Sequence, residues 1–230
     1  MSESAETRVA GELLADRQIG ESRWPPALAL LAFMAINVAL RLWLPGDSPV
    51  RVAWLVPSIE AVLLVVLIVG PAHVPVSRRW VRRVSVTLIV VLVLAALWAT
   101  TLLIYDLIKG QGVTNSPSEL LASGAVVWLG NNLSFALLYW LMDGGGPVNR
   151  KHQARPVDFA FTQQLDREID PGWRPVFLDY LHLGFTNATA FSPTDVMPLT
   201  LRAKYTMLVQ STVALALFGL IVARAVNAFT

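Results

Sequence analysis

The chain contains no cysteine in its 230 residues, which excludes disulfides, thiolate metal sites and cysteine nucleophiles. Charge is scarce as well, because Asp, Glu, Lys and Arg together make up only 15% of the sequence. The three histidines, His73, His152 and His182, lack the paired spacing of a metal site. Neither Gly-x-Ser-x-Gly nor His-Glu-x-x-His occurs. The sequence therefore predicts no metal site, no cofactor and no enzymatic activity.

Apolar sequence is abundant instead. Hydrophobic residues make up 55% of the chain, and the mean hydropathy is +0.56. A soluble domain of this size has no core large enough to bury so much apolar surface, whereas several stretches approach the roughly 20 apolar residues that cross a bilayer. We therefore expect an integral membrane protein whose main partner is the lipid bilayer. Its pI near 9.2 reflects short basic clusters beside apolar segments and does not indicate nucleic-acid binding.

The predicted fold is all-α, with about five transmembrane helices plus one re-entrant half-helix. Proline and glycine pairs mark the ends of the apolar segments, and the five predicted spans are residues 26–44, 52–70, 84–108, 119–141 and 201–229. Residues 176–191 are shorter and more polar. A full crossing there would cost roughly 2.5 to 3.5 kcal/mol for each central charge, so we expect this segment to dip in and return. If it crosses, the chain has six spans.

Basic residues predict the orientation. Lys and Arg near spans favour the cytoplasmic side, and twelve of them lie in the N-terminal tail and in the second and fourth connections: Arg8, Arg17, Arg23, Arg78, Arg79, Arg82, Arg83, Arg150, Lys151, Arg155, Arg167 and Arg174. Only Arg51 and Lys109 lie in the first and third connections. We therefore expect an inner-membrane protein with a cytoplasmic tail (1–23), a four-helix transmembrane unit (24–141), a cytoplasmic connection (142–175) and a final unit (176–230).

The half-helix carries a polar stripe. Asp179, His182, Thr186 and Thr189 recur at three- and four-residue spacing and so share one helix face. One interpretation is a cavity lining in which His182, a residue type that titrates near neutral pH, exchanges protons with Asp179. The alternative is an interfacial helix whose Asp179 and His182 lie at headgroup level.

The turn after the half-helix supplies three more candidate lining residues, Ser192, Thr194 and Asp195. Asp195 lies just before the last span. Its carboxylate is expected either to accept hydrogen bonds from the next helix turn or to concentrate cations at a pore mouth.

Glu60 lies in the middle of the second predicted span, where an ionisable group indicates function by default. Its candidate partners are Arg41, His182, Asn131 and Asn132. The alternative is a protonated Glu60 that hydrogen-bonds to a neighbouring helix and holds the packing. For Asn131 and Asn132 we favour interhelical hydrogen bonds over ion binding.

Two resemblances concern the last quarter of the chain. Asp179-Tyr-Leu, Phe185-Thr186, Ser192-Pro-Thr-Asp195 and Ala223-Arg-Ala-Val-Asn227 lie between Trp173 and Asn227. This stretch resembles the C-terminal part of a family of bacterial integral membrane proteins catalogued as a domain of unknown function. The resemblance implies a fold and a membrane location but no activity.

The same stretch is more loosely similar to the pore helix, filter and inner helix of potassium channels. Asp195-Val-Met-Pro198 matches the end of that filter. Ser192 and Thr194 stand where the filter has its two glycines, and Pro193 lies between them. Because those glycines permit the φ values that aim the filter carbonyls inward, the sequence argues against a potassium-selective filter of that type.

Two functions follow as hypotheses. The first is a channel-like protein that passes an ion or proton through a cavity formed by the hairpin 176–200, which implies a homo-oligomer around a shared axis. The second is a non-conducting structural or accessory protein that binds a partner through residues 142–175. A transporter built on Glu60 ranks last, because 230 residues show no inverted repeat.

Overall fold

The computed structural model describes residues 24–43, 55–69, 78–109, 117–151, 156–165, 173–189 and 195–229. Its long helices are α2 (Trp24–Trp43), α3 (Leu55–Val69), α4 (Arg78–Lys109), α5 (Pro117–Met142), α8 (Phe177–Thr189) and α9 (Leu201–Phe229). Shorter elements follow α5: η2 (Asp143–Gly145), α6 (Pro147–Lys151), β1 (Phe159–Phe161), α7 (Thr162–Leu165) and β2 (Val196–Pro198). The protein is mostly helical, as the sequence predicts.

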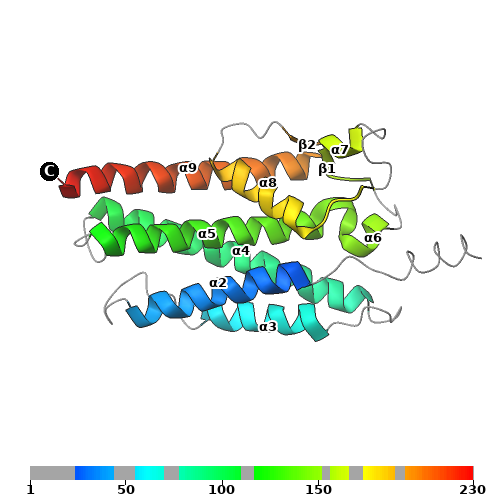
Figure 1. The fold of residues 1–230 in the computed structure, drawn as a ribbon, viewed down its shortest axis with the longest axis horizontal. Helices are drawn as coiled ribbons and strands as arrows, with labels where there is room; N and C mark the ends of the chain where they lie inside the picture. The colour runs from blue at the N-terminus through cyan, green and yellow to red at the C-terminus, as the bar shows by residue number, and fades with distance from the viewer. Residues whose placement is uncertain are drawn as a thin grey trace, which may run out of the picture.

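The long helices lie side by side along one direction, with α5 at the centre (Figure 1). Helix α5 packs against α4, α8, α9 and α2, while α3 packs against α2 and α4. Apolar residues therefore cover α5 on most sides, whereas α4 and α9 each keep a broad exposed face. On α9 that face carries Tyr205, Leu208, Leu215 and Phe218. In a bilayer such a face contacts lipid.

Three helical segments are long and apolar enough to cross a membrane: Arg83–Tyr105, Leu120–Gly145 and Leu201–Ala223. They correspond to the third, fourth and fifth predicted spans. The first predicted span corresponds to the shorter apolar stretch Trp24–Ala39 of α2, and the second to α3, which has 15 residues. At 1.5 Å per residue, 15 residues extend about 22 Å, less than the roughly 30 Å hydrocarbon core. A span at α3 therefore remains a prediction.

Local chemistry explains both ends of α5 and the start of α9. Pro117 is the first residue of α5, a position where its missing N–H is not needed. After α5, Gly144, Gly145 and Gly146 have φ values of 56°, 82° and 96°, which L side chains rarely adopt. At the start of α9, the Thr200 hydroxyl accepts a hydrogen bond from the backbone N–H of Ala203 at 3.3 Å, as an N-cap residue does.

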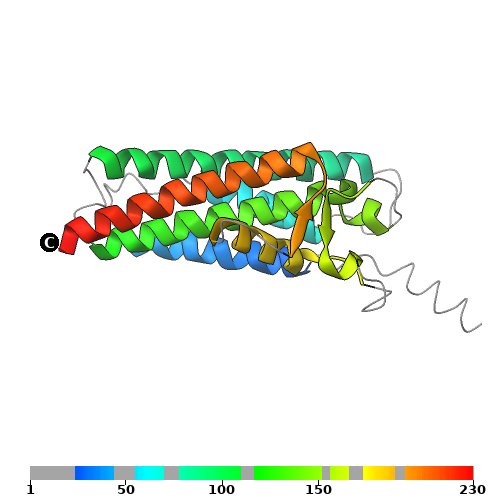
Figure 2. The same ribbon diagram turned by 90° about the horizontal axis from the view of Figure 1, so that it is seen from above.

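Helix α8 enters the bundle and the chain comes back to the same end. In Figures 1 and 2, α8 begins near β1, at the end where α5 finishes, and stops about midway along the bundle. Strand β2 and the start of α9 lie at the same end of the bundle as the start of α8. The strands β1 and β2 pair antiparallel, with Ala160 opposite Met197. The sequence does not predict this ladder, because three-residue strands are too short to show a period of two.

Candidate functional site

The hairpin formed by α8, β2 and the start of α9 has an inner face that lies directly on α5. At Gly184 the two helices approach closely: a Cβ built there would lie 3.2 Å from the carbonyl oxygen of Asn132 and 3.5 Å from Cβ of Ala136. Tyr180, Leu183 and Asn187 are buried on the same side of α8. A larger residue at position 184 would have to push the two helices apart.

A buried polar network joins α5, α8 and α9 beside this contact. Its centre is Gln210, which is fully buried. The side-chain oxygen of Gln210 accepts from the Tyr139 hydroxyl at 2.7 Å and from Nδ2 of Asn187 at 2.8 Å. Its Nε2 donates to the Gly184 carbonyl at 2.9 Å and to Oδ1 of Asn132 at 3.3 Å. All four hydrogen-bonding positions of the amide are used, so the network fixes how far α8 enters the bundle.

A second anchor holds the open end of the hairpin. The carboxylate of Asp143 is fully buried just after α5. Oδ1 accepts from the backbone N–H groups of Asp158 at 2.6 Å and Phe159 at 3.3 Å. Oδ2 accepts from the hydroxyl of Tyr180 at 2.5 Å. One carboxylate thus ties the end of α5 to β1 and to the first turns of α8.

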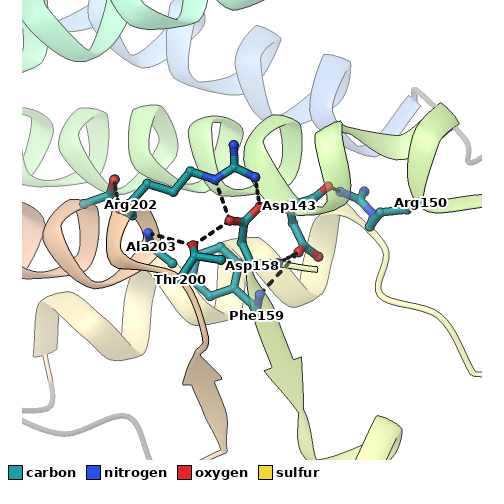
Figure 3. Close-up of polar contacts among 8 residues, drawn as sticks. Asp143, Arg150, Asp158, Phe159, Thr200, Arg202 and Ala203 are labelled. Atoms are coloured by element: carbon teal, nitrogen blue, oxygen red, sulfur yellow. Dashed lines mark hydrogen bonds and ion pairs between the residues drawn. The ribbon is translucent and has the colours of Figure 1, made fainter. Parts of the chain in front are cut away.

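Asp158 connects this end of α5 to the start of α9 (Figure 3). Its side chain is fully buried, and Arg202 donates to it twice, from Nε at 2.5 Å and from Nη2 at 2.6 Å. The Thr200 hydroxyl adds a third hydrogen bond at 2.6 Å. The backbone carbonyl of Asp158 accepts from the Leu199 N–H at 2.8 Å. We call Asp143, Asp158, Thr200 and Arg202 the clasp.

Arg150 completes the end of α5. Its Nη1 donates to the carbonyls of Trp140 at 2.6 Å and Asp143 at 3.0 Å. The guanidinium also lies 4.9 Å from the centre of the Tyr180 ring. A cation at the C-terminus of a helix compensates the helix dipole and its unpaired carbonyls. Arg150 therefore contributes structure here in addition to any role in orienting the chain.

The outer face of α8 is polar and open. The His182 side chain is 60% exposed, and its Nε2 lies 3.0 Å from Oδ2 of Asp195, which is 43% exposed. Asp179 does not contact His182 through a described hydrogen bond; its Oδ2 accepts from the Val176 N–H at 2.7 Å and so caps α8. The partner of His182 is thus Asp195 and not, as the spacing predicts, Asp179. We call Asp179, His182, Thr186, Thr189 and Asp195 the outer stripe.

The threonines of the outer stripe are partly satisfied within α8. The Thr186 hydroxyl donates to the carbonyl of His182 at 3.0 Å, and that of Thr189 to the carbonyl of Phe185 at 2.9 Å. Exposed Leu178 and Phe185 lie beside these polar residues, at one edge of the outer stripe. Asp195 does not cap α9, because Thr200 does. Its own backbone carbonyl accepts from the N–H of Thr162 at 3.3 Å.

The remaining predicted site residues fall in three places. Ser192 and Thr194 lie outside the described residues. Glu60 is buried in α3 and accepts a hydrogen bond from Asn37, which the sequence reading did not consider. Asn132 belongs to the Gln210 network, whereas the buried amide of Asn131 has no hydrogen-bond partner within the described part of the chain. The hairpin and Glu60 are therefore separate sites.

Sequence reasoning missed most of the residues that hold the hairpin. Gln210 is polar in the middle of an apolar segment, and such a position indicates interhelical hydrogen bonding. Asp143 and Asp158 gave weaker signals, since each borders a turn, where Asp is common. Their pairing with Tyr180 and Arg202 joins residues 37 and 44 positions apart, which no local pattern reveals.

Comparison of the chain with protein families, with curated proteins and with solved structures gave no match.

Proposed function

We propose that the protein is a channel-like protein of the bacterial inner membrane, in which several copies surround an axis and their outer stripes line a small aqueous path for an ion or a proton. In this proposal α2, α3, α4, α5 and α9 cross the membrane, α8 is a re-entrant helix, and the N-terminus is cytoplasmic. The resemblance of residues 173–227 to a pore-loop unit agrees with this arrangement.

The observation that carries the proposal is the direction of the polar face. Large buried side chains, among them Tyr139, Phe159 and Tyr180, fill the space between α5, α8 and β1. The polar residues of α8 that remain accessible point away from this core. A polar stripe at membrane depth requires water or another protein surface beside it. A second copy of the chain supplies that surface if the stripe faces a symmetry axis.

A non-conducting accessory role is the second candidate, and a different observation favours it. Asp179 already caps α8 by accepting from the Val176 N–H, and both threonines already bond to the backbone of α8, so the outer face can lie at headgroup level without a pore. The proposed docking segment 142–175 is less available than its polarity predicts, because Asp158, Phe159 and Phe161 are buried in it. Among the described residues of this segment, Val157 and Arg174 are exposed and available to a partner.

The mass of the purified protein in a lipid nanodisc and ion flux into proteoliposomes test the channel proposal together. The informative variant combines Thr186→Val and Thr189→Val, which preserve shape and remove two hydroxyls of the outer stripe. The matched control is Thr206→Val on α9, whose hydroxyl makes the same kind of bond, to the carbonyl four residues earlier. We expect an oligomer, and flux that falls at least tenfold in the double variant and stays unchanged in the control.

A strict monomer would remove the shared axis and with it the proposal. An oligomer without flux of protons or alkali cations would favour the accessory role. Equal loss of flux in the double variant and in Thr206→Val would mean that the outer stripe has no special part in conduction.

A further inference from the structure

Glu60 is the one carboxyl that the hairpin does not use and that the described helices bury completely. Its Oε1 accepts a hydrogen bond from Nδ2 of Asn37 on α2, at 3.3 Å. Its Oε2 has no hydrogen-bond partner within the described residues. Asn37 itself is only 5% exposed. The pair is therefore a small polar site between two apolar helices.

This site is separate from the hairpin. Helix α3 packs mainly against α2 and α4, whereas α8 packs mainly against α5 and α9. Leu63, one turn after Glu60, is fully buried and belongs to the apolar core with Leu30 of α2 and Ile89 of α4. The turn of α3 that follows Glu60 thus packs into an apolar core to which α2 and α4 both contribute.

None of the described side chains of α2, α3 and α4 supplies positive charge to Glu60; the side chain of Arg41, one of its predicted partners, lies outside the described residues. On α2, α3 and α4, the other titratable side chains that the structure describes are Arg83, Tyr105 and Lys109, and all three are exposed near the ends of α4. An ionised carboxylate in this position would lose its hydration and gain one amide hydrogen bond in return. Burial of an uncompensated charge costs far more than one such bond restores.

We infer that Glu60 and Asn37 form a proton-binding site. In the packed state Glu60 is a carboxylic acid: Asn37 donates to its carbonyl oxygen Oε1, and the proton is on Oε2, the oxygen without a partner. When water reaches the site, the O–H bond of Glu60 breaks, the proton passes to water, and a carboxylate remains. The inference rests on the proposed membrane placement of α2 and α3, but it requires neither a pore nor an oligomer.

Infrared spectroscopy of the protein in phosphatidylcholine vesicles at neutral pH tests this inference. A protonated carboxyl has a carbonyl stretching band distinct from the bands of a carboxylate. We expect the difference spectrum between the wild type and Glu60→Gln to contain one acid band and no carboxylate band. Asp179→Asn is the control, and it should leave the acid band in place. A difference spectrum that contains carboxylate bands instead would overturn the inference.

Asn37→Leu provides a second measurement that keeps Glu60 in the chain. Loss of the Nδ2 donor should shift the acid band to higher frequency, because the carbonyl oxygen is no longer hydrogen-bonded. If Glu60→Gln does not fold, the band shift in Asn37→Leu tests the inference by itself. An unshifted band would overturn it, because the protonated carboxyl would then not be the partner of Asn37. The spectra do not depend on conduction, so a protein that fails the flux test can still show the band.

Discussion

Arg202, in the first turn of α9, places both nitrogens of its guanidinium fork on the two carboxylate oxygens of Asp158, at 2.5 and 2.6 Å. The carboxylate is fully buried, while the arginine side chain is 53% exposed. Asp158 directly precedes β1, and Arg202 follows β2. The ion pair therefore closes the ladder of β1 and β2 at the end of the bundle from which α8 enters.

Arg202→Lys should lower the free energy of unfolding by about 1 to 2 kcal/mol, because an ammonium group cannot donate two parallel hydrogen bonds to Asp158. Thermal unfolding in detergent measures the change. Lys204→Arg is the control: Lys204 is exposed two residues later, so this change should stay within about 0.5 kcal/mol. Equal stability of Arg202→Lys and the wild type would mean that the second hydrogen bond of the guanidinium adds nothing to the ion pair with Asp158.

Gly144→Ala tests the turn after α5. Gly144 has a φ of +56°, and a Cβ there would lie 2.7 Å from Cγ of Arg150. We expect a loss of about 1 to 3 kcal/mol from the backbone strain and the displaced arginine. Gly219→Ala is the matched control, since nothing lies within 4 Å of a Cβ at that position in α9. It should be neutral or stabilising by about 0.5 to 1 kcal/mol, because alanine favours helix. Thermal unfolding of both variants in the same detergent measures the two changes in stability.

Gln210→Leu removes the centre of the buried network and leaves Tyr139, Asn187 and the Gly184 carbonyl without their shared partner. We expect a loss of about 2 to 3 kcal/mol, since each orphaned buried group costs about 1 to 3 kcal/mol and some re-pair. Protease cleavage near α8 should also become faster, because the network holds that helix. Ser211→Ala, one residue later, removes a hydroxyl that donates to the Leu208 carbonyl of the same helix and should change neither property. Cleavage at the wild-type rate in Gln210→Leu would show that the clasp alone holds α8.

The sequence predicts the helices well because their signals are local. Apolar runs bounded by Pro and Gly give α2, α3, α4, α5 and α9 to within a few residues, except that α4 begins at Arg78, six residues before the predicted Val84. The basic residues before Val84 are good helix formers, so the helix continues through them beyond the apolar segment. The half-helix is predicted for the same reason, since its polarity and length differ from those of its neighbours.

The contacts of the site are harder to predict, because they join distant residues. Periodicity correctly puts Asp179, His182, Thr186 and Thr189 near one face of α8, and it cannot say that His182 pairs with Asp195, thirteen residues later. It also cannot pair Glu60 with Asn37, which lies 23 residues away on another helix. Those pairings depend on how helices pack, and packing is set by many apolar contacts at once.

The absence of native cysteine allows a clean test of topology. Single cysteines introduced by Gln163→Cys, in exposed α7, and by Thr230→Cys report which side of the membrane each position faces. If α8 is re-entrant, a membrane-impermeant maleimide applied to spheroplasts should label Thr230→Cys and spare Gln163→Cys until the membrane is permeabilised. Protection of both positions before permeabilisation would mean that residues 176–191 cross the membrane and that the chain has six spans.

The last prediction concerns the charge of Asp195. Its Oδ2 lies 3.0 Å from Nε2 of His182, and both side chains are open to the outer side of α8. An exposed pair of this kind contributes about 0.2 to 1 kcal/mol, so Asp195→Asn should fold almost as well as the wild type.

If the carboxylate concentrates cations at a pore mouth, Asp195→Asn should lower flux severalfold at low ionic strength. The deficit should shrink at high ionic strength, because salt then screens the wild-type charge over a few ångströms. His182→Gln removes the histidine and keeps the Asp195 carboxylate. At low ionic strength its flux should therefore exceed that of Asp195→Asn, as the flux of the wild type does. Flux through Asp195→Asn that equals the wild type at every salt concentration would show that this charge has no part in conduction and would favour the accessory role.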